Sequence, residues 1–307
     1  MKKLVNLLLM LIVVQTTSCQ TKEQEIMKNR IDTSEDYIID KSKPKTGYYL
    51  QINNQNCHYK ILTNDLLNYS YQDSYPTFSV RVPMNSKIMI SGEQKLSVIV
   101  TPNQGHKLNR NADITISLIR YADMSNETDF GGATTIMEWE MPSLQDNDNM
   151  PMYRFDTIFK AEVPFQLNTI NHAEDLTKMD KDILLKEVVN QFELMHDYIK
   201  NDYDKFNFLA KERLKYLSMP FYSTDEKMLQ VLENNKINLN KPENKKILQP
   251  LENYKMVLYG NGRVATLERL KDEGRVIWGK NPDTGNEKYS LPLFVYKDTR
   301  DNQWHIW

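Results

Sequence analysis

The strongest constraint on the fold is a series of short segments, between about residues 47 and 165, in which apolar and polar residues alternate. Leu96, Val98 and Val100 occupy every second position of one segment, and residues 113–121 repeat the pattern. Successive side chains of a strand point to opposite faces, so this period buries one face of each strand. Turn residues and prolines separate the segments, as in an all-β sandwich. We therefore predict an antiparallel β-sandwich domain over residues 46–166.

The sandwich prediction also assigns individual strands and turns. A turn is expected at Ser91–Gln94, where Gly92 supplies a permissive backbone. The strands are expected at residues 48–52, 58–64, 77–84, 87–90, 95–102, 113–121, 134–141 and 155–165.

A change of period marks a second module. After a polar segment at 166–180, which we interpret as a linker, Asp180 is placed to cap a helix. Residues 202–217 are predicted to continue as a second helix, and Ser223–Glu226 form a capping-box pattern before a third. The apolar face of the first helix recurs at spacings of three and four: Leu184, Val188, Phe192, Met195 and Ile199.

The C-terminal residues return to a strand pattern. A hairpin is predicted about Asn261 and Gly262, the strongest short-range hairpin signal. Further strands are expected at residues 275–279, 288–298 and 304–307. The sequence thus predicts an α+β chain, in which the β-sandwich is followed by a smaller module, residues 178–307, of about three helices and an antiparallel β-meander.

Both modules resemble known architectures. The strand, turn, strand cadence from Tyr59 to Pro102 resembles jelly-roll β-sandwich modules that accompany sugar-active enzymes. The helices and meander ending in Trp304-His305-Ile306-Trp307 resemble the cone fold of nuclear transport factor 2 and its relatives. These resemblances imply a fold only, because each architecture serves enzymes, ligand binders and association modules.

The first residues of the chain predict a signal for export from the cytoplasm. Lys2 and Lys3 precede an apolar run of about eleven residues, Leu4 to Val14, which is too short to span a bilayer. Small polar residues and then Cys19 follow. This stretch resembles the signal peptide of a bacterial lipoprotein, in which the cysteine is lipidated and becomes the new N-terminus. We also weighed an ordinary secretory signal, with Cys19 incidental, and a buried N-terminal helix.

The lipoprotein resemblance implies a chain of defined parts and a location. Residues 1–18 would be the signal peptide, Cys19 would carry palmitate and other acyl chains, and residues 19–45 would be a polar tether. The protein would lie in the cell envelope and face the periplasm or the cell surface. Gln20, in place of the aspartate of inner-membrane lipoproteins, favours the outer membrane.

The charge of the chain argues against a nucleic-acid partner, and its cysteine content argues against an internal disulfide. The formal net charge is −2, and removal of Lys2 and Lys3 makes it more negative, so nucleic acid is not an expected partner. With Cys19 modified, only Cys57 remains, so the mature chain is expected to form no internal disulfide. We interpret Cys57 as a small buried apolar residue, since its neighbour His58 would point to the opposite face of a strand.

The sequence contains no motif that predicts catalysis. It lacks a nucleophile elbow, a phosphate-binding glycine loop, zinc-ligand spacing and an EF-hand loop. The densest polar cluster, His196 and Asp197 with Asp202 and Asp204, is interpreted as a solvated helix face. No catalytic residue, metal ligand or cofactor is therefore assigned.

Aromatic residues mark one candidate contact loop between residues 68 and 78. Tyr69, Tyr71, Tyr75 and Phe78 could offer rings to a glycan if they are exposed, whereas packing over the end of the sandwich is the alternative.

Three classes of function remain at this point. The leading hypothesis is a non-catalytic, membrane-anchored binding protein with a protein partner, such as an immunity-type inhibitor of a secreted toxin. The second is a surface glycan-binding lipoprotein. The third is an enzyme or ligand binder that uses the cone of the C-terminal module.

Overall fold

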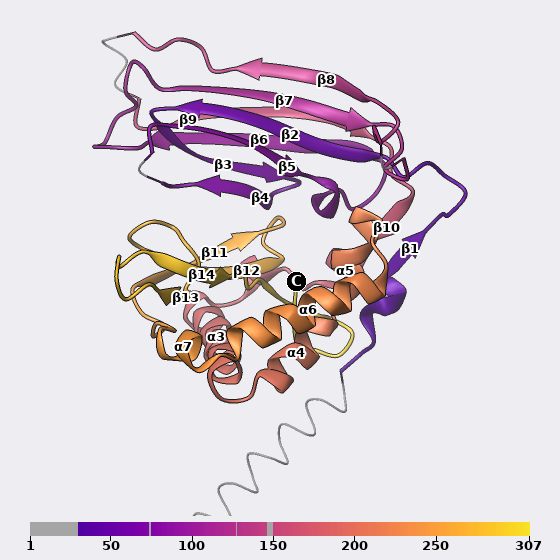
Figure 1. Ribbon diagram of the computed structural model, residues 1–307, viewed down its shortest axis with the longest axis vertical. Coiled ribbons are helices and arrows are strands. Elements are labelled where there is room, and N and C mark those ends of the chain that lie inside the picture. The colour runs from indigo at the N-terminus through magenta and orange to yellow at the C-terminus, as the bar shows by residue number, and fades with distance from the viewer. Residues whose placement is uncertain (1–29, 74, 127, 146–149) are drawn as a thin grey trace, which may run out of the picture.

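The computed structural model describes residues 30–73, 75–126, 128–145 and 150–307. It confirms the α+β architecture, in which an antiparallel β-sandwich is followed by helices and then by antiparallel strands. Figure 1 shows the sandwich at one end of the longest axis and the C-terminal module at the other. Among the described residues, no helix combines the length and the apolar character needed to cross a bilayer.

Two four-stranded antiparallel sheets form the sandwich. One has the order β5-β2-β7-β8 and the other the order β4-β3-β6-β9, so β8 and β9 are the outer strands at one side of the sandwich and β4 and β5 at the other. The strands are β2 (Gly47–Gln55), β3 (Cys57–Thr63), β4 (Leu66–Tyr71), β5 (Thr77–Pro83), β6 (Gly92–Pro102), β7 (Asp113–Tyr121), β8 (Ala133–Glu140) and β9 (Tyr153–Ala161).

The alternating residues fill the space between the sheets, as predicted. Leu96, Val98 and Val100 of β6 are completely buried, and the inward residues of β7 are buried in the same way. Burial of each such side chain stabilises the fold by about 1.5–3 kcal/mol.

Two details of the sandwich differ from the sequence prediction. Residues 87–90 are not a strand, since a 3₁₀ turn, η2 (Asn85–Lys87), occupies this region. The predicted turn at Ser91–Gln94 is instead the start of β6, because Gly92, with φ of +127°, pairs with Ala161 of β9. Strand β4 was not predicted, because its residues lack a clear alternation.

The helices of the C-terminal module begin where their caps indicate. Asp180 accepts hydrogen bonds from the backbone N–H groups of Asp182 and Ile183 at the start of α3 (Lys181–Asn201), and the predicted apolar face is buried. Thr224, rather than Ser223, caps α6 (Asp225–Leu239). The predicted second helix is divided at Glu212 and Arg213 into α4 (Tyr203–Lys211) and α5 (Leu214–Ser218), followed by η4 (Met219–Phe221), and α7 (Pro242–Lys246) follows α6.

The final strands form a four-stranded sheet and a separate pair. The sheet has the order β11-β12-β15-β16, and β13 pairs with β14. The predicted hairpin is confirmed, with residues 260–263 as its loop and positive φ at both Asn261 and Gly262. Pro292 separates two strands where one was predicted. The strands are β11 (Tyr254–Tyr259), β12 (Val264–Arg269), β13 (Ile277–Lys280), β14 (Glu287–Leu291), β15 (Val295–Lys297) and β16 (Trp304–Ile306).

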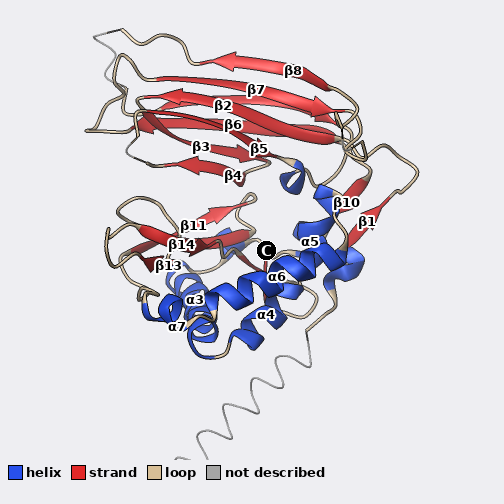
Figure 2. Cartoon of the chain, in the orientation of Figure 1, coloured by secondary structure: helices blue, strands red, loops and turns tan. Residues whose placement is uncertain are grey.

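The segment interpreted as a linker is built into the fold. It begins in β10 (Phe165–Leu167), which pairs with β1 (Tyr37–Ile39), and continues through α2 (Thr169–His172) and η3 (Leu176–Lys178). Leu176 is completely buried. Figure 2 shows α3, α4 and α7 on the side of the module away from the sandwich.

The two modules share one apolar core and a set of polar contacts. Tyr216, Tyr259 and Trp307 belong to the same buried cluster as the sandwich core. Nζ of Lys60 in β3 lies 2.8 Å from a carboxylate oxygen of Glu268 in β12, and both side chains are largely buried. The sandwich therefore rests on the C-terminal module through packed side chains.

Residues 30–45, predicted to belong to the tether, contact the C-terminal module. The Arg30 guanidinium donates to both carboxylate oxygens of Glu212 at 2.6 Å and to the carbonyl oxygen of Trp304 at 2.7 Å. Farther on, η1 (Thr33–Asp36) ends at Asp36, whose carboxylate accepts two hydrogen bonds from Arg300. The chain is thus held in place from Arg30 onward.

Candidate functional site

The aromatic residues predicted to contact a ligand form a packed stack instead of an open platform. Tyr71, at the end of β4, is only 5% exposed and stacks on Phe78 of β5, with ring centroids 4.8 Å apart. Its other face lies against Tyr59, at 5.6 Å. Tyr69 is half-buried and also contacts the Tyr59 ring. These rings close the β4/β5 side of the sandwich.

One member of the predicted set remains open to solvent. The side chain of Tyr75 is 67% exposed, and its carbonyl oxygen accepts a hydrogen bond from the Tyr71 hydroxyl at 3.0 Å. A glycan that stacks on several rings would find only Tyr75 freely available here. The other predicted site residue, Cys19, lies outside the described residues.

Cys57 and the histidines do not assemble a reactive site. Cys57 is buried, and burial raises the pKa of its thiol to about 11, so the nucleophilic thiolate is scarce at neutral pH. His58 lies on the opposite face of β3, where Nε2 contacts the carbonyl oxygen of Asp73. Within the described ranges, no three His, Cys, Asp or Glu side chains are grouped so that they could hold a metal ion.

The other side of the sandwich offers a different kind of surface. Strands β8 and β9 are the outer strands of their sheets, and neither pairs with a further strand in the described part of the chain. Ile136 on β8 is 41% exposed and Ile158 on β9 is 63% exposed. Outer strands carry unpaired backbone groups, which native proteins usually protect with charges, bulges or short strands.

A stack of aromatic rings closes one part of the gap between β8 and β9. The Trp139 ring of β8 lies almost parallel to Phe155 of β9, with centroids 4.4 Å apart, and Tyr153 stacks beside it at 6.1 Å. These half-buried rings join the two sheets across their edges. Toward the other end of the strands, the described residues form no parallel stack, and the Phe159 ring lies tilted against Tyr48, with centroids 6.1 Å apart.

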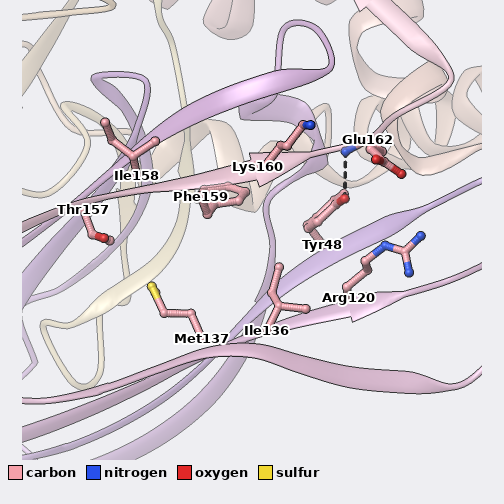
Figure 3. Close-up of a pocket in the computed structure, with 9 residues that line it drawn as sticks. All are labelled: Tyr48, Arg120, Ile136, Met137, Thr157, Ile158, Phe159, Lys160 and Glu162. Atoms are coloured by element: carbon pink, nitrogen blue, oxygen red, sulfur yellow. Dashed lines mark hydrogen bonds between the residues drawn. The ribbon is translucent and has the colours of Figure 1, made fainter.

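A groove of about 620 Å³ lies in that remaining part of the gap. Figure 3 shows Phe159 and Thr157 pointing from β9 toward β8, and Ile136 and Met137 pointing from β8 toward β9. At one end, the Tyr48 hydroxyl accepts a hydrogen bond from the backbone N–H of Glu162 at 2.8 Å. The groove is thus apolar where Ile136, Met137 and Phe159 line it and polar at the end near Tyr48.

A β-bulge explains why two consecutive residues of β8 line the groove. Leu118 of β7 pairs with Met137, whereas the next residue, Ile119, pairs with Thr135, so Ile136 is the extra residue. A bulge re-aims side chains that would otherwise alternate between the two faces. The sequence analysis predicted an ordinary strand at residues 134–141 and did not predict this groove, because the extra residue depends on the register with β7.

Charged groups lie toward the Tyr48 end of the groove, as Figure 3 shows. Arg120, Lys160 and Glu162 contribute to the lining. None of the three forms an ion pair with another residue in the ranges that the structure describes. Such groups remain available to polar atoms of a ligand.

The nine lining residues of the groove include no histidine, cysteine or aspartate. An apolar groove bordered by polar groups and two unpaired strand edges is the type of surface that accepts an extended peptide.

Comparison of the chain with protein-family models, with curated proteins and with solved structures found no match.

Proposed function

We propose that this protein is a non-catalytic binding protein, anchored in the cell envelope through a lipid on Cys19, which holds a segment of a partner protein against the groove between β8 and β9. The observation that carries the proposal is the coincidence of two unpaired strand edges with the groove between them, flanked by the exposed Ile136 on β8 and by the exposed Ile158 on the outward face of β9. A partner strand would add main-chain hydrogen bonds to an edge and bury these side chains.

The charge pattern of β9 supports this choice of site. Arg154 and Asp156 form an ion pair on the outward face of the strand, and Lys160 is exposed farther along. Charges of this kind protect a strand edge from unwanted pairing. Between them, the exposed Ile158 leaves a short apolar interval on this outward face, beside the groove.

An immunity-type inhibitor of a secreted toxin is one form that this function could take. Such a protein needs an anchor outside the cytoplasm and a surface that binds another protein. The anchor is proposed from residues 1–19, and the groove supplies a surface.

The anchor is tested by growing cells with radiolabelled palmitate and fractionating their membranes. We expect label and membrane retention in the wild-type protein and loss of both in Cys19→Ala. A wild-type protein that carries no label and stays soluble would contradict the anchor.

The groove is tested by a photocrosslinking amino acid placed at position 158 in growing cells. The matched control is position 237 on α6, where Ile237 is 61% exposed and Ile158 is 63% exposed. We expect a discrete protein adduct from position 158 and none from position 237. Equal adducts at both positions, or no adduct at position 158, would contradict a specific partner at the groove.

A further inference from the structure

Arg30 is fixed on the C-terminal module by buried contacts. Arg30 is held by Glu212, which follows α4, and by the carbonyl oxygen of Trp304 in β16. The Arg30 side chain is 9% exposed, and its guanidinium also lies 3.2 Å from Nδ1 of His305. A largely buried ion pair with several hydrogen bonds fixes its position much better than an exposed pair would.

The distance between Arg30 and the proposed anchor is limited by the chain between them. Eleven positions separate Cys19 from Arg30 in the sequence. A fully extended chain of that length spans at most about 40 Å. If Cys19 carries a lipid, Arg30 therefore lies no farther than about 40 Å from the membrane.

The surface next to Arg30 has the composition of a membrane contact. Phe208 and Lys211 are one helical turn apart on α4, and both side chains are exposed. The aromatic ring is 53% exposed. Lys211 forms no ion pair with the other described residues. An exposed aromatic ring beside a free lysine suits the boundary between lipid headgroups and acyl chains.

A second cavity lies at this place. It has a volume of about 370 Å³, and its lining combines the N-terminal segment with α4 and α5. Lys215 in the lining is paired with Asp225, and Glu212 with Arg30, while Asp32 accepts the backbone N–H of Ser34. Its lining residues include Arg30, Ile31, Asp32, Phe208, Lys211 and Lys215.

We propose that this surface, formed by Phe208 and Lys211 of α4 beside Arg30, rests on the anionic phospholipid surface of the membrane that holds the anchor. The occupant follows from the short reach between Cys19 and Arg30 and from the complementarity between the free lysine and phosphate. The inference rests on the proposed lipid anchor.

The consequence is a defined orientation of the molecule. In Figure 1 the indigo N-terminal segment and α4 lie toward the lower end of the longest axis, while β8 lies at the upper end. With α4 on the membrane, the groove between β8 and β9 faces away from it. A partner could then reach the groove without displacing lipid.

The test places a photocrosslinking amino acid at position 208 of the full chain, in cells whose phospholipids are labelled with radioactive phosphate. Position 75 is the control, because Tyr75 is an exposed aromatic residue on the sandwich, at 67% against 53% for Phe208. We expect at least fivefold more phosphate-labelled adduct from position 208 than from position 75. Lys211→Glu should reduce the adduct from position 208 at least twofold.

The outcomes separate this inference from the anchor. If Cys19 carries palmitate but positions 208 and 75 give equal adducts, the orientation is wrong and the anchor stands. If the adduct is insensitive to Lys211→Glu, the choice of an anionic surface is wrong. If Cys19 carries no palmitate and the protein is soluble, the anchor and the orientation both fail.

Discussion

At the scale of single residues, the tyrosines of the predicted contact loop have separate roles. Tyr71 is buried between Tyr59 and Phe78, whereas Tyr75 is mostly exposed. These aromatic residues lie close together in the sequence. Which of their rings is exposed to solvent, however, depends on how β4 pairs with β3 and how β5 pairs with β2. That pairing is not encoded within the loop.

Truncation of these two tyrosines should therefore have different effects on stability. We expect Tyr71→Ala to lower the free energy of unfolding by about 3–5 kcal/mol, because a buried aromatic side chain leaves a cavity. Tyr75→Ala should change it by less than about 0.5 kcal/mol. Urea denaturation measures both, and similar losses for the two variants would contradict the packed stack.

The buried carboxylates near Arg30 predict a dependence of stability on pH. Burial raises the pKa of Glu212, but hydrogen bonds from His305 and Arg30 outweigh burial and hold the pKa below its usual 4.5. The pKa of Asp301 is likewise lowered, because backbone N–H groups of Ile31 and Gln303 outweigh the effect of burial. A carboxyl group with a lowered folded-state pKa stabilises the fold fully above its unfolded-state pKa and loses this contribution as pH falls through the folded value.

We expect Glu212→Gln to cost about 3 kcal/mol at pH 7, since it breaks a largely buried ion pair. The difference from the wild type should shrink at an acid pH well below 4.5, because the wild-type carboxylate loses its contribution as pH falls through its lowered pKa. Urea unfolding at both pH values measures this, with the exposed Glu243→Gln as control. A difference that is independent of pH would show that Glu212 does not act through its charge.

At the scale of elements, the sequence predicted the features that depend on residues within a single helix or strand. The cap and the apolar face of α3 lie within the helix itself, so the sequence located this element and its buried residues. The β8/β9 groove could not be predicted in this way, because it depends on which strands are outermost and on the extra residue Ile136. Strand β4 was missed because half-buried residues fill most of it.

The N-cap of α3 can be tested by substitution of Asp180. Asp180→Ala removes the acceptor for two backbone N–H groups and should destabilise the protein by about 1 kcal/mol. Asp180→Asn keeps an acceptor oxygen and should be nearly neutral. Thermal unfolding of the two variants separates them, and equal losses would point to the charge of Asp180 instead of its hydrogen bonds.

At the scale of the whole molecule, the two modules behave as one structure because their cores and charges meet. The Glu268 side chain is 6% exposed and contacts both Lys60 of the sandwich and Tyr259 of its own module. The sequence predicted two modules but could not show this contact, since Lys60 and Glu268 are far apart along the chain. A shared core favours a single cooperative unfolding transition.

We expect Lys60→Met to lower the free energy of unfolding by about 3 kcal/mol, because Glu268 would lose its buried cationic partner. Lys43→Met, which removes an exposed pair with Asp40, should cost less than about 1 kcal/mol. Calorimetry should show one transition for the wild type. Two resolved transitions would contradict a shared core.

The most direct test of the account asks whether both sides of the groove hold the same partner. A photocrosslinking amino acid at position 158 on β9 is combined with Ile136→Asp on β8, across the groove. The account predicts that this substitution reduces the adduct from position 158 at least tenfold while the amount of folded protein is unchanged. An undiminished adduct would show that the partner binds elsewhere and would contradict the groove as the binding site.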